Sequence, residues 1–234
     1  MDLLDRVYPV AVPLLDRLDA TLLAGGAPAD HPIWPLLRRL GALPGEIVGQ
    51  LAGVVPDGLT GAADTARQQA DAYRHRTDEV PMPAAWRGPA ADAYAATWSG
   101  LSAHLAGSGP DSLAGRLTDT AGYLDDVAAW LARARRALAG TVAECLGSAE
   151  AVTLRSAPAT ADWLSGGGTG SGAPSPGAAA LAAATLGAHL LGTTAEILDD
   201  GRAVTDWWAG RLGELTYRPP APAAAASADQ LRLG

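Results

Sequence analysis

Four histidines and one cysteine are the residues of this chain best suited to metal binding or nucleophilic chemistry. His31, His75, His104 and His189 are isolated in the sequence, with no HExxH pair and no Cys/His spacing that would hold zinc. Cys145 falls on an apolar repeat, where a cysteine is usually a small buried hydrophobe. A lone cysteine also forms no internal disulfide. We therefore expect structural roles for all five residues.

Two pairs of adjacent aspartates are the next candidates for chemistry, as general acid and base. They are Asp125–Asp126 and Asp199–Asp200. Neighbours on a helix point about 100° apart, so neither pair converges on one substrate atom. The letters GTGSGA at 168–173 match a dinucleotide-binding pattern, but they follow no strand and lie in a Gly/Ser/Pro tract, which favours a linker. The sequence thus predicts no catalytic residue, no cofactor and no metal, and an enzyme is the least favoured class.

The composition predicts a globular protein that does not bind nucleic acid. Hydrophobic residues make up 48% of 234 residues, and the formal net charge is −8. The chain lacks lysine, which excludes a Walker A loop and a pyridoxal Schiff base. The 17 basic residues are scattered arginines. Their closest cluster, Arg133, Arg135 and Arg136, is interpreted as the solvated face of a helix.

Neither a secretory signal nor a stable membrane span is expected. The first residues, MDLLDRVYPV, carry aspartates where a secretory signal has positive charge. The most apolar run, 178–192, is mostly alanine and is shorter than the roughly 20 residues of a spanning helix. We interpret it as a buried helix.

Proline, glycine and apolar periodicity divide the chain into segments that nearly all predict helix. Residues 1–55 are expected to form short helices, because Pro9, Pro13 and Pro35 argue against one long helix. From Asp57 a helix with a seam of small residues should run to about Glu79, before the prolines at 81 and 83. The seam consists of Leu59, Ala63, Ala66, Ala70 and Tyr73.

The clearest periodic signal is a leucine at every seventh position of a helix predicted from Asp111 to Gly147, with Asp111 or Ser112 as its cap. We call Leu117, Leu124, Leu131 and Leu138 the leucine stripe; Cys145 continues it. So long a helix needs a partner along this face, either internal or external. The leucine stripe is therefore the predicted association face.

The C-terminal part holds a second candidate for partner contact. Trp207 and Trp208 are adjacent on a predicted amphipathic helix, so they cannot both face one narrow core. Either one packs while the other is exposed to a partner or a membrane interface, or both pack within a wide groove.

The predicted organisation has five parts. They are short N-terminal helices (1–55), a long helical hairpin (56–164), a Gly/Ser/Pro linker (165–177), a C-terminal helical pair (178–217) and a disordered tail (218–234). The fold class is all-α, a helical bundle built around an antiparallel helix–WxG–helix hairpin.

The hairpin turn is predicted in the stretch AAWRGPAADAYAATW, residues 84–98. Gly88 supplies a residue that tolerates positive φ, and Pro89 suits the first turn of the next helix. Trp86 can lay its ring over apolar surface that the turn leaves bare. The alanines that follow allow the second helix to approach the first closely.

This arrangement resembles the WXG100 (ESX-like) superfamily, the small helical-hairpin proteins of type VII secretion. Trp86 and Gly88 carry the resemblance, supported by the alanine-rich run through Tyr94 and Trp98, and it covers about Asp57 to Ser148. Membership implies a four-helix bundle of two hairpins, as a homodimer or heterodimer. It also implies export by the type VII machinery without a cleavable signal, and therefore a secreted or cell-surface location.

The sequence departs from the family at the tail signal Tyr-x-x-x-Asp/Glu. The residues four positions after Tyr73, Tyr123 and Tyr217 are threonine, valine and alanine. This departure has three alternative explanations: a partner supplies the signal, the signal is degenerate, or the protein is not exported. The alternative function is a non-secreted cytoplasmic helical scaffold, or an adaptor for a separately encoded toxin.

Overall fold

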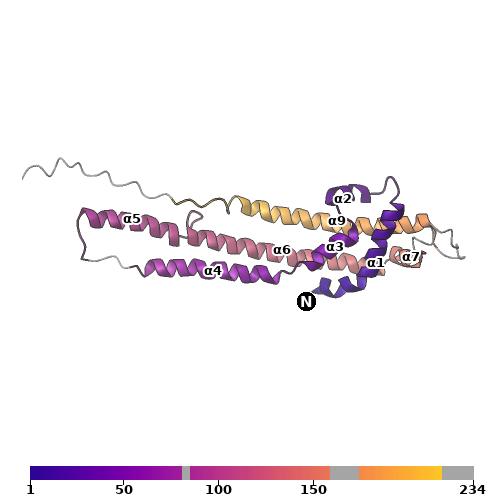
Figure 1. Cartoon of the computed structure of the whole chain (residues 1–234), viewed down its shortest axis with the longest axis horizontal. Coiled ribbons are helices and arrows are strands. Elements are labelled where there is room, and N and C mark those ends of the chain that lie inside the picture. The colour runs from indigo at the N-terminus through magenta and orange to yellow at the C-terminus, as the bar shows by residue number, and fades with distance from the viewer. Residues whose placement is uncertain (81–84, 159–173, 218–234) are drawn as a thin grey trace, which may run out of the picture. The chain divides into compact units, whose positions relative to one another are not determined.

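The computed structural model describes residues 1–80, 85–158 and 174–217, and every regular element in these ranges is a helix. The all-α class is therefore confirmed. The predicted tail, 218–234, and most of the predicted linker lie outside the described residues. The helices are α1 (Leu3–Gly25), α2 (Ile33–Leu40), α3 (Pro44–Gly53), α4 (Asp57–Asp78), α5 (Pro89–Ala106), α6 (Leu113–Gly147), α7 (Ala149–Ser156) and α9 (Pro176–Ala209) (Figure 1).

The chain divides into two compact units. Unit 1 contains residues 1–56 and 127–204, and unit 2 contains residues 57–126 together with those from 205 onward. Helices α6 and α9 contribute residues to both units. This division differs from the predicted hairpin domain of 56–164, because the second half of α6 packs with the N-terminal helices.

Unit 1 has a single large apolar core. Helix α1 contacts α3 and α7, and the second half of α6 and most of α9 contribute to the same cluster. The core includes Leu4, Leu14, Leu15, Leu18, Leu22, Ile33, Val48, Leu138, Val142, Cys145, Leu154, Leu186, Leu190, Leu191 and Ile197.

Helix α1 corrects the prediction that prolines divide the first 55 residues into short helices. Pro9 and Pro13 both lie inside one helix of 23 residues. They are four positions apart and neither is buried, so their rings share one face of the helix, toward solvent. Each interior proline costs about 3 kcal/mol. Burial of the α1 leucines, at roughly 1.5–3 kcal/mol each, outweighs that cost.

Unit 2 is built on the antiparallel pair α4 and α5, which contact one another (Figure 1). The predicted small-residue seam is confirmed for Ala63, Ala66 and Ala70, which are all buried. Two of these alanines share a small cluster with Ala121 of α6, and Leu124 packs against it. The close approach that the alanines permit thus joins α4 to the first half of α6 as well.

The start of α6 confirms one of the two predicted caps. The hydroxyl of Ser112 accepts a hydrogen bond from the Gly115 amide at 3.1 Å and donates to the carbonyl of Gly109 at 2.8 Å. Ser112 therefore closes the interruption after α5 and begins α6.

Helix α9 corrects the predicted C-terminal pair of helices, because one continuous helix covers 176–209. Gly192, where the first of the two was expected to end, lies inside it. A glycine in a helix costs about 1 kcal/mol. The buried residues on either side, Leu190, Leu191 and Ala195, offset that cost.

Among the described residues, α9 is the one helix long and apolar enough to cross a membrane by length and composition. Just over half of its most apolar window, 56%, is buried within the structure, as in a core helix of a soluble protein. This is weak evidence for a span.

Candidate functional site

The turn that leads into α5 has the backbone geometry that the WxG pattern predicted. Gly88 has φ +104° and ψ 178° and lies at the N-cap of α5, and Pro89 opens the helix. This region of φ/ψ space is open essentially to glycine alone. The prediction of positive φ at Gly88 is confirmed.

Trp86 lies on the surface beside this turn. Its side chain is 46% exposed, and its ring centroid is 5.4 Å from that of Tyr94, with 49° between the ring planes. Tyr94 is also exposed. We call Trp86 and Tyr94 the aromatic pair; it presents apolar rings with polar edges to solvent.

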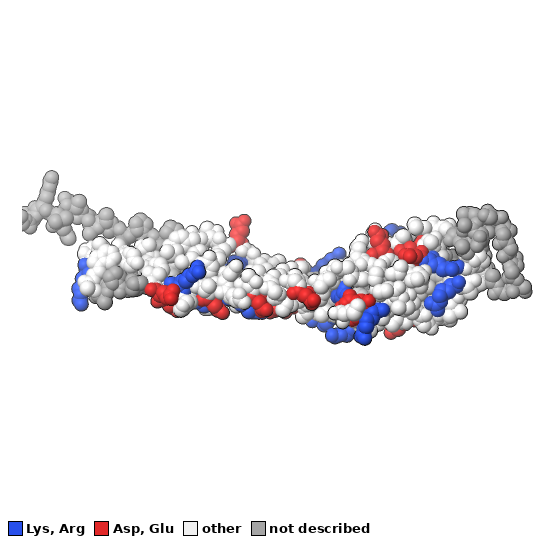
Figure 2. Space-filling model, turned by 60° about the horizontal axis from the view of Figure 1, so that its bottom comes forward, with Lys and Arg blue, Asp and Glu red and all other residues white. Residues whose placement is uncertain are grey.

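Helix α5 continues this apolar surface. All of its residues are described, none is buried, and Asp92 is its one carboxylate. The neighbouring α4 carries many charges. In the view of Figure 2, acidic and basic side chains are interspersed over the visible face, and much of the surface between them carries neither. Alanines and one ring make up most of the exposed side of α5. Ala90, Ala93, Tyr94, Ala96 and Ala103 are exposed, together with Pro89 and the polar residues Asp92, Thr97 and Ser99.

The leucine stripe is divided between the two units. Leu138 lies in the core of unit 1, where the protein's own helices cover it, and Leu131 is also buried. Leu117 and Leu124 are half-buried in unit 2. The stripe is therefore not one free association face, because its partner over the second half of α6 is internal.

The two adjacent tryptophans adopt the first of the two predicted arrangements, in which one packs and the other is exposed. Trp208 is 7% exposed, and its indole N–H donates to Asp126 Oδ2 at 2.8 Å. Trp207 is 61% exposed, with the guanidinium of Arg211 4.7 Å from its ring centroid. Trp207 keeps the role of a candidate partner contact, and Trp208 is a packing residue of unit 2.

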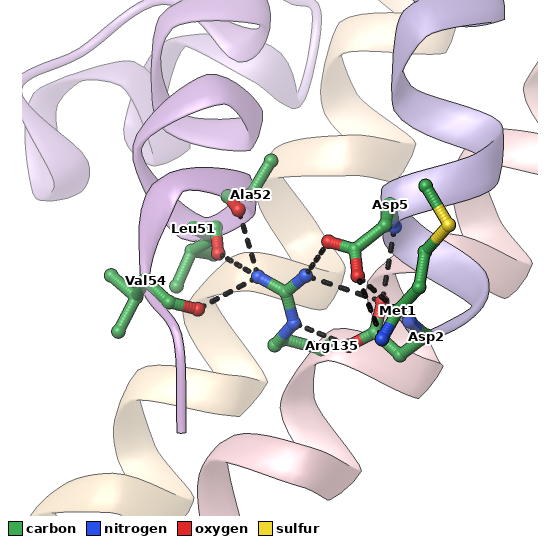
Figure 3. A network of polar contacts seen from close by, with 7 residues as sticks. All are labelled: Met1, Asp2, Asp5, Leu51, Ala52, Val54 and Arg135. Carbon is green, nitrogen blue, oxygen red and sulfur yellow. Dashed lines mark hydrogen bonds and ion pairs between the residues drawn. The ribbon is translucent and has the colours of Figure 1, made fainter. Parts of the chain in front are cut away.

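Arg135 forms a site that the sequence did not predict. The expectation of a solvated face is wrong here, because its side chain is 3% exposed. Nε donates to Asp2 Oδ2 at 2.5 Å, and Nη2 donates to Asp5 Oδ1 at 2.5 Å and to Asp2 Oδ1 at 3.2 Å. Nη1 donates to three carbonyl oxygens at 2.8–2.9 Å, those of Leu51, Ala52 and Val54 (Figure 3).

The electrostatics of this network follow from its geometry. The hydrogen bonds from Arg135, assisted by its positive charge, lower the pKa of Asp2 from 3.8 to about 2. The same hydrogen bonds raise the pKa of Arg135. A signal for this role is present in the sequence: Arg135 is four residues after Leu131 and three before Leu138, which places it on the buried face of the helix.

The side chains that could act as nucleophile, acid or base have structural roles. Burial, followed by the nearby Glu144 and Glu150, raises the pKa of the Cys145 thiol to about 11, which disfavours the thiolate. Asp125 pairs with Arg67 of α4, whereas Asp126 accepts from Trp208. The prediction that this aspartate pair diverges is confirmed.

No group of three or more metal-binding side chains is found among the described residues. His75 and His189 each pair with a glutamate, at 3.3 Å and 3.7 Å.

One cavity of about 650 Å³ lies within unit 2, beside the loop that joins α5 to α6. His104 and Tyr217 line it, with ring centroids 4.9 Å apart. Ser112 also lines it, but its hydroxyl donates to the carbonyls of Gly107 and Gly109, so it serves as the α6 cap. These hydrogen bonds give the hydroxyl a structural role.

No family model, curated protein or solved structure matches this chain.

Proposed function

We propose that this chain is a WXG100-like protein associated with type VII secretion, an exported substrate or the partner or adaptor of one. It acts by helix–helix association rather than by catalysis. The surface that carries the association is the aromatic pair together with the exposed side of α5.

The observation that supports this proposal is the lack of any buried residue in α5. Most helical stability in proteins comes from burial of an apolar face, and α5 has no buried residue to supply it. Helix α5 contacts α4 and still leaves a surface of small apolar residues exposed. A partner helix packed there would gain about 25 cal/mol for each Å² of apolar surface removed from water.

The chemistry of the surface suits a close helical partner. Alanines let two backbones approach, and they lose little side-chain entropy when they are covered. The aromatic pair provides rigid anchors of the kind that dominate interface energies. Gly88 and Pro89 set the start of α5 and so fix where the anchors lie. We expect the partner to present an apolar helix, either from a second copy of this chain or from a similar hairpin.

The alternative, a cytoplasmic scaffold or toxin adaptor, has one observation in its favour. The second half of the leucine stripe is covered internally, so that half is not open to a partner in this structure. Such a protein would use the same α5 surface inside the cell.

The test is the amount of this protein in culture supernatant from hosts with and without the type VII export ATPase. A cytoplasmic marker corrects for lysis. The proposal predicts supernatant protein that depends on the ATPase. Equal retention in the cells of both hosts would contradict direct export and favour the scaffold or adaptor.

A further inference from the structure

We propose that α1–α3 is an internal occupant of the association face of α6, and that Arg135 is the latch that holds it there. The latch controls whether the second half of the leucine stripe is covered by the chain itself or is open to another helix. The inference rests on the proposed function in one respect, namely that this chain acts by helix–helix association.

The N-terminal helices cover the second half of the leucine stripe. Leu138 and Cys145 belong to the same core cluster as the buried leucines of α1 and Val48 of α3. A helix with a heptad stripe requires a partner along that stripe. Here the N-terminal helices provide it together with α7 and α9, whose residues belong to the same cluster. The N-terminal helices thus fill part of the place that a second protein would otherwise take.

Arg135 acts at the free ends of two of these helices. Asp2 is the N-cap of α1, and it forms a capping box with Asp5, whose amide donates to Asp2 Oδ1 at 3.0 Å. The carbonyls of Leu51 and Ala52 belong to the last turn of α3. Arg135 therefore joins the N-terminus of one helix and the C-terminus of another to α6 (Figure 3).

The charges of the latch match the helix dipoles. Carboxylates are favourable at the N-terminus of α1, and a cation is favourable at the C-terminus of α3. The guanidinium supplies the cation and neutralises the carboxylates at the same time. A neutral side chain at 135 would remove both effects and take away the hydrogen bonds that Arg135 donates to three backbone carbonyls.

The position of the latch allows it to open without unfolding the whole chain. Asp2 and Asp5 are 42% and 35% exposed, so water can solvate them once Arg135 is replaced. Val54 is followed within two residues by the end of the first segment of unit 1. The hydrogen bonds that Arg135 donates all end at α1 or at the C-terminal end of α3, and none of them reaches unit 2.

The experiment compares Arg135→Gln with Arg136→Gln, because Arg136 is an exposed arginine on the same helix. Cys145 is the chain's one cysteine and is buried in the core that α1–α3 share, so its reaction with a thiol reagent such as dithionitrobenzoate reports opening. Hydrogen exchange in the full-length protein, resolved by segment, measures protection of α1, α3 and α4.

The expected result is a rise of at least tenfold in the rate of Cys145 labelling in Arg135→Gln, with loss of protection in α1 and α3. Arg136→Gln should label at the wild-type rate. Arg135→Lys, which keeps the charge but not the bidentate geometry, should label at an intermediate rate. Protection of α4 should be unchanged in all three variants.

Two results would overturn the proposal. One is labelling of Arg135→Gln at the wild-type rate, which would mean that the arginine does not hold α1–α3 closed. The other is equal loss of protection in α4, which would show global unfolding rather than release of α1–α3. Neither measurement requires secretion. The results can therefore contradict the role of Arg135 while ATPase-dependent export is observed, or support that role when no export is observed.

Discussion

Gly88 and Gly140 are two glycines at which an added methyl group would meet no other atom within 4 Å, yet their backbones differ. Gly88 has φ +104°, whereas Gly140 lies within α6. We predict that Gly88→Ala lowers the free energy of unfolding by about 1–3 kcal/mol, through backbone strain alone. Gly140→Ala should raise it by about 0.5–1 kcal/mol, because alanine is the better helix former.

Chemical denaturation of the two variants measures both effects. Because neither substitution creates a clash, Gly140→Ala serves as the control for the added methyl group. Equal stabilities of Gly88→Ala and the wild type would show that the turn does not need glycine.

The tryptophans give a second prediction at this scale. Trp208→Ala removes a buried ring and its hydrogen bond to Asp126, and should cost about 3–5 kcal/mol. Trp86 is about half exposed, so Trp86→Ala should cost about 1–2 kcal/mol. Thermal unfolding of both variants checks the order; a larger loss for Trp86→Ala would mean that its ring is a core residue.

Local pattern was enough to predict some of these residues. Positive φ at Gly88 followed from the turn, and burial of Cys145 followed from its heptad position. The burial of Arg135 was not predicted, because its charge was given more weight than its position between Leu131 and Leu138. The aspartates that make its burial tolerable are some 130 residues away in the sequence, where spacing gives no information.

At the scale of elements, α9 packs closely on α6 within unit 1. A methyl group on Gly201 would lie 2.6 Å from Trp130 Cζ2. That ring is held in place because its N–H donates to the Ile197 carbonyl at 3.0 Å. Gly201→Ala should therefore cost about 1–3 kcal/mol. The control is Gly192→Ala on the same helix, which meets nothing within 4 Å and should be slightly stabilising.

The measurement is again the free energy of unfolding, by denaturant. If Gly201→Ala were as stable as Gly192→Ala, the contact between α9 and the Trp130 ring would not be a close one.

The start of α1 predicts a pH dependence. The pKa of Asp2 falls from 3.8 to about 2 on folding, so its ionised form stabilises the folded state. This contribution is fully present above pH 4 and is lost as the pH falls through about 2. Asp2→Asn can still cap the helix but cannot pair with Arg135 as a charge.

We expect Asp2→Asn to be less stable than the wild type at pH 6, and the difference to shrink as the pH falls from about 4 to about 2. Denaturation at a series of pH values measures this. A difference that stayed constant over that range would argue against the charged pair with Arg135.

Helices predicted from apolar periodicity agree with the structure. Helix boundaries predicted within α1 and α9 from a proline or a glycine alone were wrong. The end of α4 and the cap of α6 were anticipated by local signals. Prolines in α1 and a glycine in α9 were taken as boundaries, but burial of the surrounding leucines and alanines outweighs their cost in both helices. Tertiary packing determines whether a helix continues through a proline or a glycine, and a short stretch of sequence does not show that packing.

At the scale of the whole molecule, the all-α class could be predicted, and the two units could not. The heptad stripe indicates that α6 needs a partner, but it does not say which one. Leucines of α1, more than a hundred residues earlier, share the core with Leu138. The side of α5 that starts at the aromatic pair remains uncovered, which is why the proposed function centres there.

The Trp86 end of unit 2 is the proposed recognition surface of the molecule. The most direct measurement is the ratio of supernatant to cell-associated protein for Trp86→Ala, beside the wild type, in a host with an active type VII ATPase. Gly201→Ala is the control, because its expected loss of stability is similar and arises in unit 1. We predict that Trp86→Ala stays folded in the cells and that its ratio falls at least tenfold, while Gly201→Ala remains near the wild type. Export of Trp86→Ala at the wild-type ratio would contradict this role.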